Sequence, residues 1–238
     1  YRSPGLAGAA LRLVKGRGFG EINEVLDRLA QHPSTARFVS RKIATYFVAD
    51  QPPPALVERM AQRFLQSDGR IAEVLRVMFE APEFEASLAA DQGKFKDPTR
   101  YIVSAVRLAY DREPIVNAQP MVSALYRMGQ APYNRQTPDG YPLDEAAWAS
   151  PGQMAVRFEV ARQLGAGHAA LFRADGAAPD PVAQKEAQAR ALPQLNRPQV
   201  QQSWQAALSP ATRSALGRAT TPQEWNAYFL AAPEFMVR

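Results

Sequence analysis

The chain has 238 residues, of which 46% are hydrophobic, and a formal net charge of +5 from 28 Lys and Arg against 23 Asp and Glu. The sequence contains no cysteine, which excludes disulfides, thiolate nucleophiles and iron–sulfur clusters. No stretch approaches the roughly 20 consecutive apolar residues of a transmembrane helix, and the basic residues are interspersed, which argues against nucleic-acid binding.

Residues 1–20 are expected to form an N-terminal segment that ends in the glycine-rich sequence Gly16–Gly20. Its spacing matches neither the P-loop nor the dinucleotide-binding fingerprint, so we interpret it as a flexible loop. The chain begins with Tyr1 rather than Met, and no secretory leader follows. We therefore expect it to be a processed or excised piece.

From Glu21 onward, apolar residues recur at the three- and four-residue spacing of amphipathic helices. Breaks fall at His32-Pro33, at the proline run Pro52–Pro54 and at the turn Ser67–Gly69. The pattern predicts four helices: one from Glu21 that stops before His32, one from Pro33 to Phe47, one over Leu56–Leu65 and one over Ile71–Phe79.

A short polar residue followed by proline then recurs along the chain, and this pair is typical of a helix N-cap and first helical residue. The pairs are Asp97-Pro98, Ser150-Pro151, Asp180-Pro181, Ser209-Pro210 and Thr221-Pro222. No alternating apolar and polar run is long enough to predict a strand. The expected fold is all-α, a multi-helix orthogonal bundle with long ordered loops and no significant sheet.

The composition shifts near residues 174–179, which we interpret as a linker or long loop. We expect a main helical domain over residues 21–175 and a C-terminal helical segment over residues 176–238. Its helical part, from Pro181 to Arg238, has fewer than about 60 residues and would form a marginal core alone, so the C-terminal segment is expected to pack on the main domain.

The loop from Gly129 to Trp148 is the segment that helix propensity and burial explain least. Its candidate ligand-binding residues are Gln130, Tyr133, Asp139, Tyr141 and Trp148. Aromatic faces beside amide and carboxylate groups suit a sugar or peptide. The alternative is an ordered loop that fills a gap between helices, with Asp139 bonded to backbone amides, to Arg157 or to Arg107.

Metal and catalytic motifs are weak throughout the sequence. His32 and His168 are the only histidines, and Asp139, Asp144 and Glu145 lack the ligand spacing of a calcium loop. No serine lies in a nucleophile elbow, and no pair of carboxylates stands out. We therefore expect no metal and no cofactor, and we assign no catalytic residue.

An ordered set of motifs resembles the bacterial family known as domain of unknown function 1800. The set comprises His32–Val39, Arg41-Lys42, Tyr46-Phe47, Pro52–Val57 with Phe64, Ala81–Phe84, Lys96, Pro98, Arg107, Gly129-Gln130, Pro138–Pro142, Trp148 and Arg157. The resemblance implies the C-terminal half of a larger protein and an extracytoplasmic location, with the cytoplasm left open. It supplies no activity.

The sequence leaves two hypotheses for function. The first is a non-enzymatic helical module of an exported bacterial protein that binds a protein partner or a cell-surface polymer. Its structural or partner-binding residues would be His32, Arg37, Arg41, Arg107 and Arg157. The second is a hydrolase whose site is shared with an absent N-terminal half and uses Asp139, Gln130 and His32.

Overall fold

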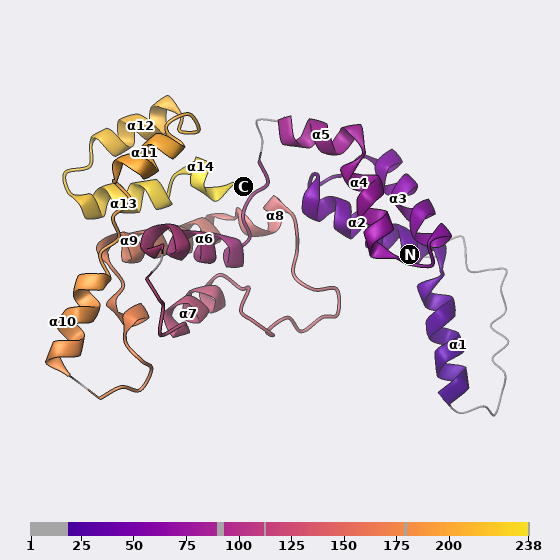
Figure 1. Ribbon diagram of the computed structural model, residues 1–238, viewed down its shortest axis with the longest axis horizontal. Coiled ribbons are helices and arrows are strands. Elements are labelled where there is room, and N and C mark those ends of the chain that lie inside the picture. Colours follow the sequence, from indigo (N-terminus) through magenta and orange to yellow (C-terminus); the bar gives the residue numbers. More distant parts are fainter. Residues whose placement is uncertain (1–18, 90–92, 112, 179, 238) are drawn as a thin grey trace. The chain divides into compact units, whose positions relative to one another are not determined.

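The computed structural model describes residues 19–89, 93–111, 113–178 and 180–237. The chain divides into two compact units, Tyr1–Ala89 (unit 1) and Ala90–Arg238 (unit 2) (Figure 1). This division differs from the expected main domain of residues 21–175, because the apolar residues before and after residue 90 form two separate cores. Most of the glycine-rich sequence at residues 16–20 lies outside the described residues, and Gly20 belongs to the first helix.

Unit 1 contains five helices in its described part. They are α1 (Phe19–Ala30), α2 (Pro33–Phe47), α3 (Pro54–Gln66), α4 (Ile71–Phe79) and α5 (Pro82–Ala89). The four helices predicted up to Phe79 are confirmed. Helices α2, α3 and α4 pack around fully buried Leu56, Met60, Val74 and Met78.

Helix α1 forms at the predicted place, but its apolar face is not part of the unit 1 core. Ile22, Leu26 and Leu29 are 55%, 56% and 58% exposed. Amphipathic spacing therefore predicted the helix correctly, but this spacing does not specify whether the apolar face of the helix packs against another element.

Unit 2 is also helical. Its elements are α6 (Pro98–Tyr110), α7 (Gln119–Arg127), α8 (Glu145–Trp148), α9 (Pro151–Ala166), the 3₁₀ helix η1 (Ala169–Phe172), α10 (Pro181–Arg190), α11 (Pro198–Trp204), α12 (Pro210–Gly217), α13 (Pro222–Leu230) and α14 (Pro233–Met236). Among the described residues the only β interaction is an isolated antiparallel bridge between Phe95 and Val237. The all-α prediction is confirmed.

Each predicted pair of a polar residue and proline begins a helix of unit 2. In all five the polar side chain accepts a hydrogen bond from a backbone N–H of the first turn, and proline occupies the first helical position. The caps satisfy amides that the helix itself leaves unbonded.

Helices α9 and α13 pack closely against each other, which joins the C-terminal helices to the rest of unit 2. The buried Asn226 of α13 donates hydrogen bonds to the carbonyls of Gly165 and Pro193. The hydroxyl of buried Tyr101 on α6 donates to the carbonyls of Arg157 and Leu230, at 3.0 and 3.2 Å. These bonds connect α6, α9 and α13 around one core.

Candidate functional site

The aromatic residues of the 129–148 loop use their polar atoms within the loop. The hydroxyl of Tyr141 donates to the Ala131 carbonyl at 2.7 Å, and the indole N–H of Trp148 donates to the Pro142 carbonyl at 3.0 Å. Trp148 is buried, Tyr141 is half-buried, and their ring centroids lie 6.3 Å apart. These bonds and contacts fix the loop's geometry.

Asp139 lies at the exposed turn of this loop, where the following Gly140 takes a positive φ of 76°. It accepts hydrogen bonds from Thr137 and from Arg135, the latter at 3.1 Å. Arg135 is thus an ion-pair partner of Asp139, whereas the sequence suggested backbone amides, Arg157 or Arg107. The Thr137 hydroxyl and then the Arg135 guanidinium hold the pKa of this carboxyl below its usual range. A general acid in hydrolysis requires the opposite shift.

Gln130 and Tyr133 are placed differently from each other. The Gln130 side-chain oxygen accepts a hydrogen bond from the backbone N–H of Thr99, at 2.7 Å, so it caps the first turn of α6. Tyr133 is fully exposed and has a φ of 56°, in the left-handed region. The structure therefore brings Tyr141 and Trp148 together, while Gln130 caps α6 and Tyr133 lies exposed at the surface.

Two cationic side chains lie in the interior of unit 2. Arg157 of α9 is 0% exposed, and its guanidinium donates to the Lys96 carbonyl at 2.7 Å. It lies over the rings of Phe95 and Tyr101, at 4.6 and 4.9 Å from their centroids. Burial lowers the pKa of Arg157 to about 10.

Lys96 is 7% exposed and lies against the C-terminal helix α14. Its Nζ donates to the Phe235 carbonyl at 2.6 Å and lies 4.0 Å from the centroid of the Phe235 ring. Its backbone N–H donates to the Met236 carbonyl at 2.7 Å. Burial, and secondarily the neighbouring charge of Arg157, lower the pKa of Lys96 to about 8.

Lys96 also lines a hollow of about 670 Å³ in unit 2, which we call the cationic hollow. The other residues that line it are Thr99, Arg100, Val103, Ser104, Arg107, Leu108, Asp111, Trp204 and Phe235. Most of them follow the outward side of α6 at helical spacing, and the two aromatic rings lie 5.9 Å apart. Three basic residues and one acid line it, so it can hold an anionic group beside apolar surface.

The charges of the hollow differ in how they are paired. Arg100 pairs with Asp97 at 2.5 Å, so its charge is partly compensated. Arg107 is exposed and makes no ion pair with any residue of the described structure. Asp111, the acid at the end of α6, has a φ of 47°. Arg107 is therefore the basic side chain most available to a ligand.

Among the residues of the hollow, sequence reasoning named Arg107 as a candidate and Lys96 as part of a motif, and it did not bring them together with the others. The basic side of α6, with Arg100 and Arg107, was readable from helical spacing. Trp204 and Phe235 join it from positions about a hundred residues or more along the chain, and no local pattern predicts that contact.

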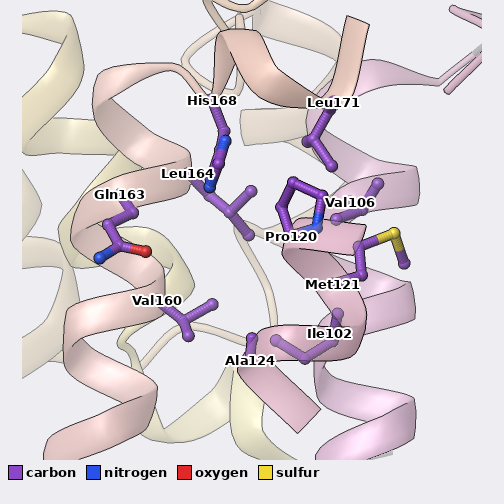
Figure 2. A pocket seen from close by; sticks show the side chains of 10 residues that line it. All are labelled: Ile102, Val106, Pro120, Met121, Ala124, Val160, Gln163, Leu164, His168 and Leu171. Carbon is purple, nitrogen blue, oxygen red and sulfur yellow. The ribbon is translucent and has the colours of Figure 1, made fainter. Parts of the chain in front are cut away.

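A second, smaller pocket lies between α6, α7, α9 and η1 (Figure 2). Its volume is about 20 Å³, room for roughly one water molecule. The His168 ring points toward Leu164 among mainly apolar side chains (Figure 2), and burial lowers the pKa of this histidine. In the described parts of the chain no three His, Asp or Glu side chains come together as a metal site.

Three predicted residues lie on α2 of unit 1 or directly before it. The His32 ring accepts a hydrogen bond from the Ser34 backbone N–H at 3.1 Å, so His32 is an N-cap. Arg37 forms an exposed two-pronged pair with Glu58, at 2.9 and 3.4 Å. Arg41 is exposed on the same helix. Arg37 and Arg41 thus form an accessible basic surface, while Arg157 is internal to unit 2.

Residues 9–237 match the family model described as "Protein of unknown function (DUF1800)". The chain belongs to the DUF1800 family. No curated protein and no solved structure matches it. The DUF1800 match spans both units, so α2 and the cationic hollow both lie within the matched range. Within the described structure, every helix is too short or too polar to cross a membrane.

Proposed function

We propose that this DUF1800 chain is a non-enzymatic binding module of an exported bacterial protein, and that it binds an acidic segment of a partner protein in the cationic hollow. The observation that carries the proposal is the hollow itself, with Arg107 and Arg100 on one wall and Trp204 and Phe235 on another. Its volume of about 670 Å³ suits a few peptide residues.

The distribution of charge favours an acidic ligand with an apolar residue. A carboxylate near Arg107 gains an ion pair without displacing an existing one. An apolar side chain beside Val103, Leu108 and Trp204 removes apolar surface from water on both sides. The two features together distinguish this ligand from a neutral sugar.

Export is proposed from the family resemblance. A chain of 238 residues without cysteine is compatible with an oxidising compartment, where stray thiols form unwanted disulfides. Fractionation of the native bacterium with an antibody to this chain tests this part directly.

Binding is tested with a fluorescein-labelled peptide of alternating glutamate and leucine, measured by fluorescence anisotropy at low salt. We expect Arg107→Glu to weaken binding by roughly tenfold or more, because it replaces an attraction with a repulsion. The affinity should also fall with added salt. A lysine–leucine peptide of the same length is the control ligand.

Arg41→Glu is the matched control variant, since it reverses an exposed arginine of unit 1. Loss of binding in Arg41→Glu but not in Arg107→Glu would move the site to the Arg37–Arg41 surface. Equal affinity for both peptides would refute the acidic-ligand proposal. If polygalacturonate displaced the labelled peptide and unlabelled glutamate–leucine peptide did not, the ligand would be an anionic polysaccharide instead.

A further inference from the structure

Lys96 has the surroundings that make a lysine amine a nucleophile. A lysine reacts with carbonyl compounds when it is desolvated or lies near another cation, because both favour the neutral amine. Lys96 is 7% exposed, lines the cationic hollow, and has Arg157 as its charged neighbour. It makes no ion pair with any carboxylate in the described residues.

The contacts of the amine are compatible with a neutral state. Among the described residues its hydrogen-bond partner is the Phe235 carbonyl, at 2.6 Å, and a neutral amine still has a hydrogen to donate there. The lone pair then remains free for reaction. The Phe235 ring, 4.0 Å away, favours the ammonium form.

The hollow that Lys96 lines also holds the charged side chains of Arg100, Arg107 and Asp111, while Arg157 is the charged neighbour that lowers the pKa of Lys96. Arg157 of α9 disfavours a second positive charge, and Tyr101 of α6 has a pKa raised by burial, so it remains neutral. Together with burial, Arg157 keeps the pKa of Lys96 near 8, against 10.5 for an ordinary lysine. The free amine is therefore present at neutral pH in a far larger fraction than at a solvated lysine.

We propose that the cationic hollow also captures small anionic aldehydes or keto acids, through a reversible imine between their carbonyl carbon and Nζ of Lys96. The neutral amine attacks the carbonyl carbon, and a proton moves to the carbonyl oxygen to give a carbinolamine. Loss of water then gives the imine, so one amine and one carbonyl yield one imine and one water. This capture goes beyond the proposed function, since a small carbonyl compound is a different ligand from an acidic peptide.

The anionic requirement comes from the walls of the hollow. Arg100 and Arg107 lie about two turns apart on the same side of α6, so a carboxylate of the ligand is attracted to the same hollow that Lys96 lines. Trp204 and Phe235 offer apolar surface for a flat ligand. An aromatic aldehyde with a carboxylate matches the arginines, the amine of Lys96 and the apolar rings.

The test uses 4-formylbenzoate with the full chain at pH 7.5, followed by sodium borohydride, which reduces an imine to a stable secondary amine. Peptide mass spectrometry then assigns the adduct among the five lysines, Lys15, Lys42, Lys94, Lys96 and Lys185. We expect Lys96 to be modified at least about tenfold faster than Lys94 or Lys185, given its lowered pKa.

Two substitutions sharpen the test. Lys96→Arg keeps a cation that can donate to the Phe235 carbonyl but cannot form an imine, so its adduct should disappear. Lys94→Arg is the matched control and should react like the wild type. Arg107→Glu should lower the yield with 4-formylbenzoate more than with uncharged benzaldehyde.

Equal modification of Lys96 and the exposed Lys185 in the wild type would overturn the inference, and this comparison requires no variant. An adduct at Lys96 without binding of the glutamate–leucine peptide would support this inference and refute the proposed function. Peptide binding without an adduct at Lys96 would support the proposed function and refute this inference.

Discussion

At the scale of single residues, Lys96 and Arg157 are unusual because both are buried cations that lack a carboxylate partner in the described structure. Each instead donates to a backbone carbonyl and lies over aromatic rings, which offsets part of the cost of desolvation. Nε of Arg157 has no hydrogen-bond partner in the part of the chain that the structure describes. The pair therefore retains a net electrostatic penalty that a change in pH can relieve.

This penalty predicts a pH dependence of stability at Lys96. Its folded-state pKa of about 8 lies below its ordinary 10.5, so between these values the unfolded chain binds more protons than the folded one. The unfolding free energy of the wild type should therefore rise through this window, relative to Lys96→Met, by up to about 3 kcal/mol. Urea unfolding of both proteins at about pH 7 and about pH 10 measures the difference.

Lys185→Met is the control for this experiment, because Lys185 is exposed. The unfolding free energy of this variant should change with pH in parallel with that of the wild type. A wild-type curve parallel to that of Lys96→Met would show that Lys96 titrates as an ordinary lysine. Groups common to both proteins, including Tyr101, cancel in the comparison.

Residue-level predictions succeeded where the cause is local. The caps at Asp97 and Ser150 each depend on neighbours within a few positions, and both are confirmed. The bond between Lys96 and Phe235 joins residues 139 positions apart. No spacing rule reaches that far, so the sequence marked Lys96 as part of a motif without indicating its surroundings.

At the scale of elements, the contact of α9 with α13 depends on a glycine. A Cβ at Gly165 would lie 2.7 Å from the backbone nitrogen of Ala227 and 3.0 Å from the Gln223 carbonyl oxygen. Both are backbone atoms, so α13 would have to shift. Gly165 therefore sets how closely the C-terminal segment approaches the main helices.

Gly165→Ala should lower the unfolding free energy by about 1–3 kcal/mol, despite the better helix propensity of alanine. Gly152→Ala is the matched control at the other end of α9, where a Cβ meets nothing within 4 Å. It should raise stability by about 0.5–1 kcal/mol. Equal effects of the two substitutions in urea unfolding would mean that the helices adjust without cost.

The elements themselves were largely predictable. Proline after a polar residue fixed the starts of α6, α9, α10, α12 and α13, because the side chain caps the helix and proline has its φ already set. Two things were not predictable: the division near residue 90 and the exposed face of α1. Both depend on which apolar faces meet, and amphipathic spacing does not specify a partner.

At the scale of the whole molecule, each unit has its own core. The buried residues of unit 1, such as Met60, and those of unit 2, such as Met128, belong to separate clusters. A unit with its own core can unfold by itself if few contacts connect it to the rest of the chain. The units are therefore expected to respond separately to a change in either core.

The tryptophans make this expectation measurable, because Trp148, Trp204 and Trp225 all belong to unit 2. Met60 and Met128 are both 0% exposed, so Met60→Ala and Met128→Ala are matched substitutions that should each cost about 2–5 kcal/mol in their own unit. Met60→Ala should shift part of the far-ultraviolet circular dichroism transition and leave the tryptophan fluorescence midpoint in place. Met128→Ala should move the fluorescence midpoint. If Met60→Ala moved the fluorescence midpoint as far as Met128→Ala does, the two units would unfold as one cooperative body, and the separate cores would not define separate folding units.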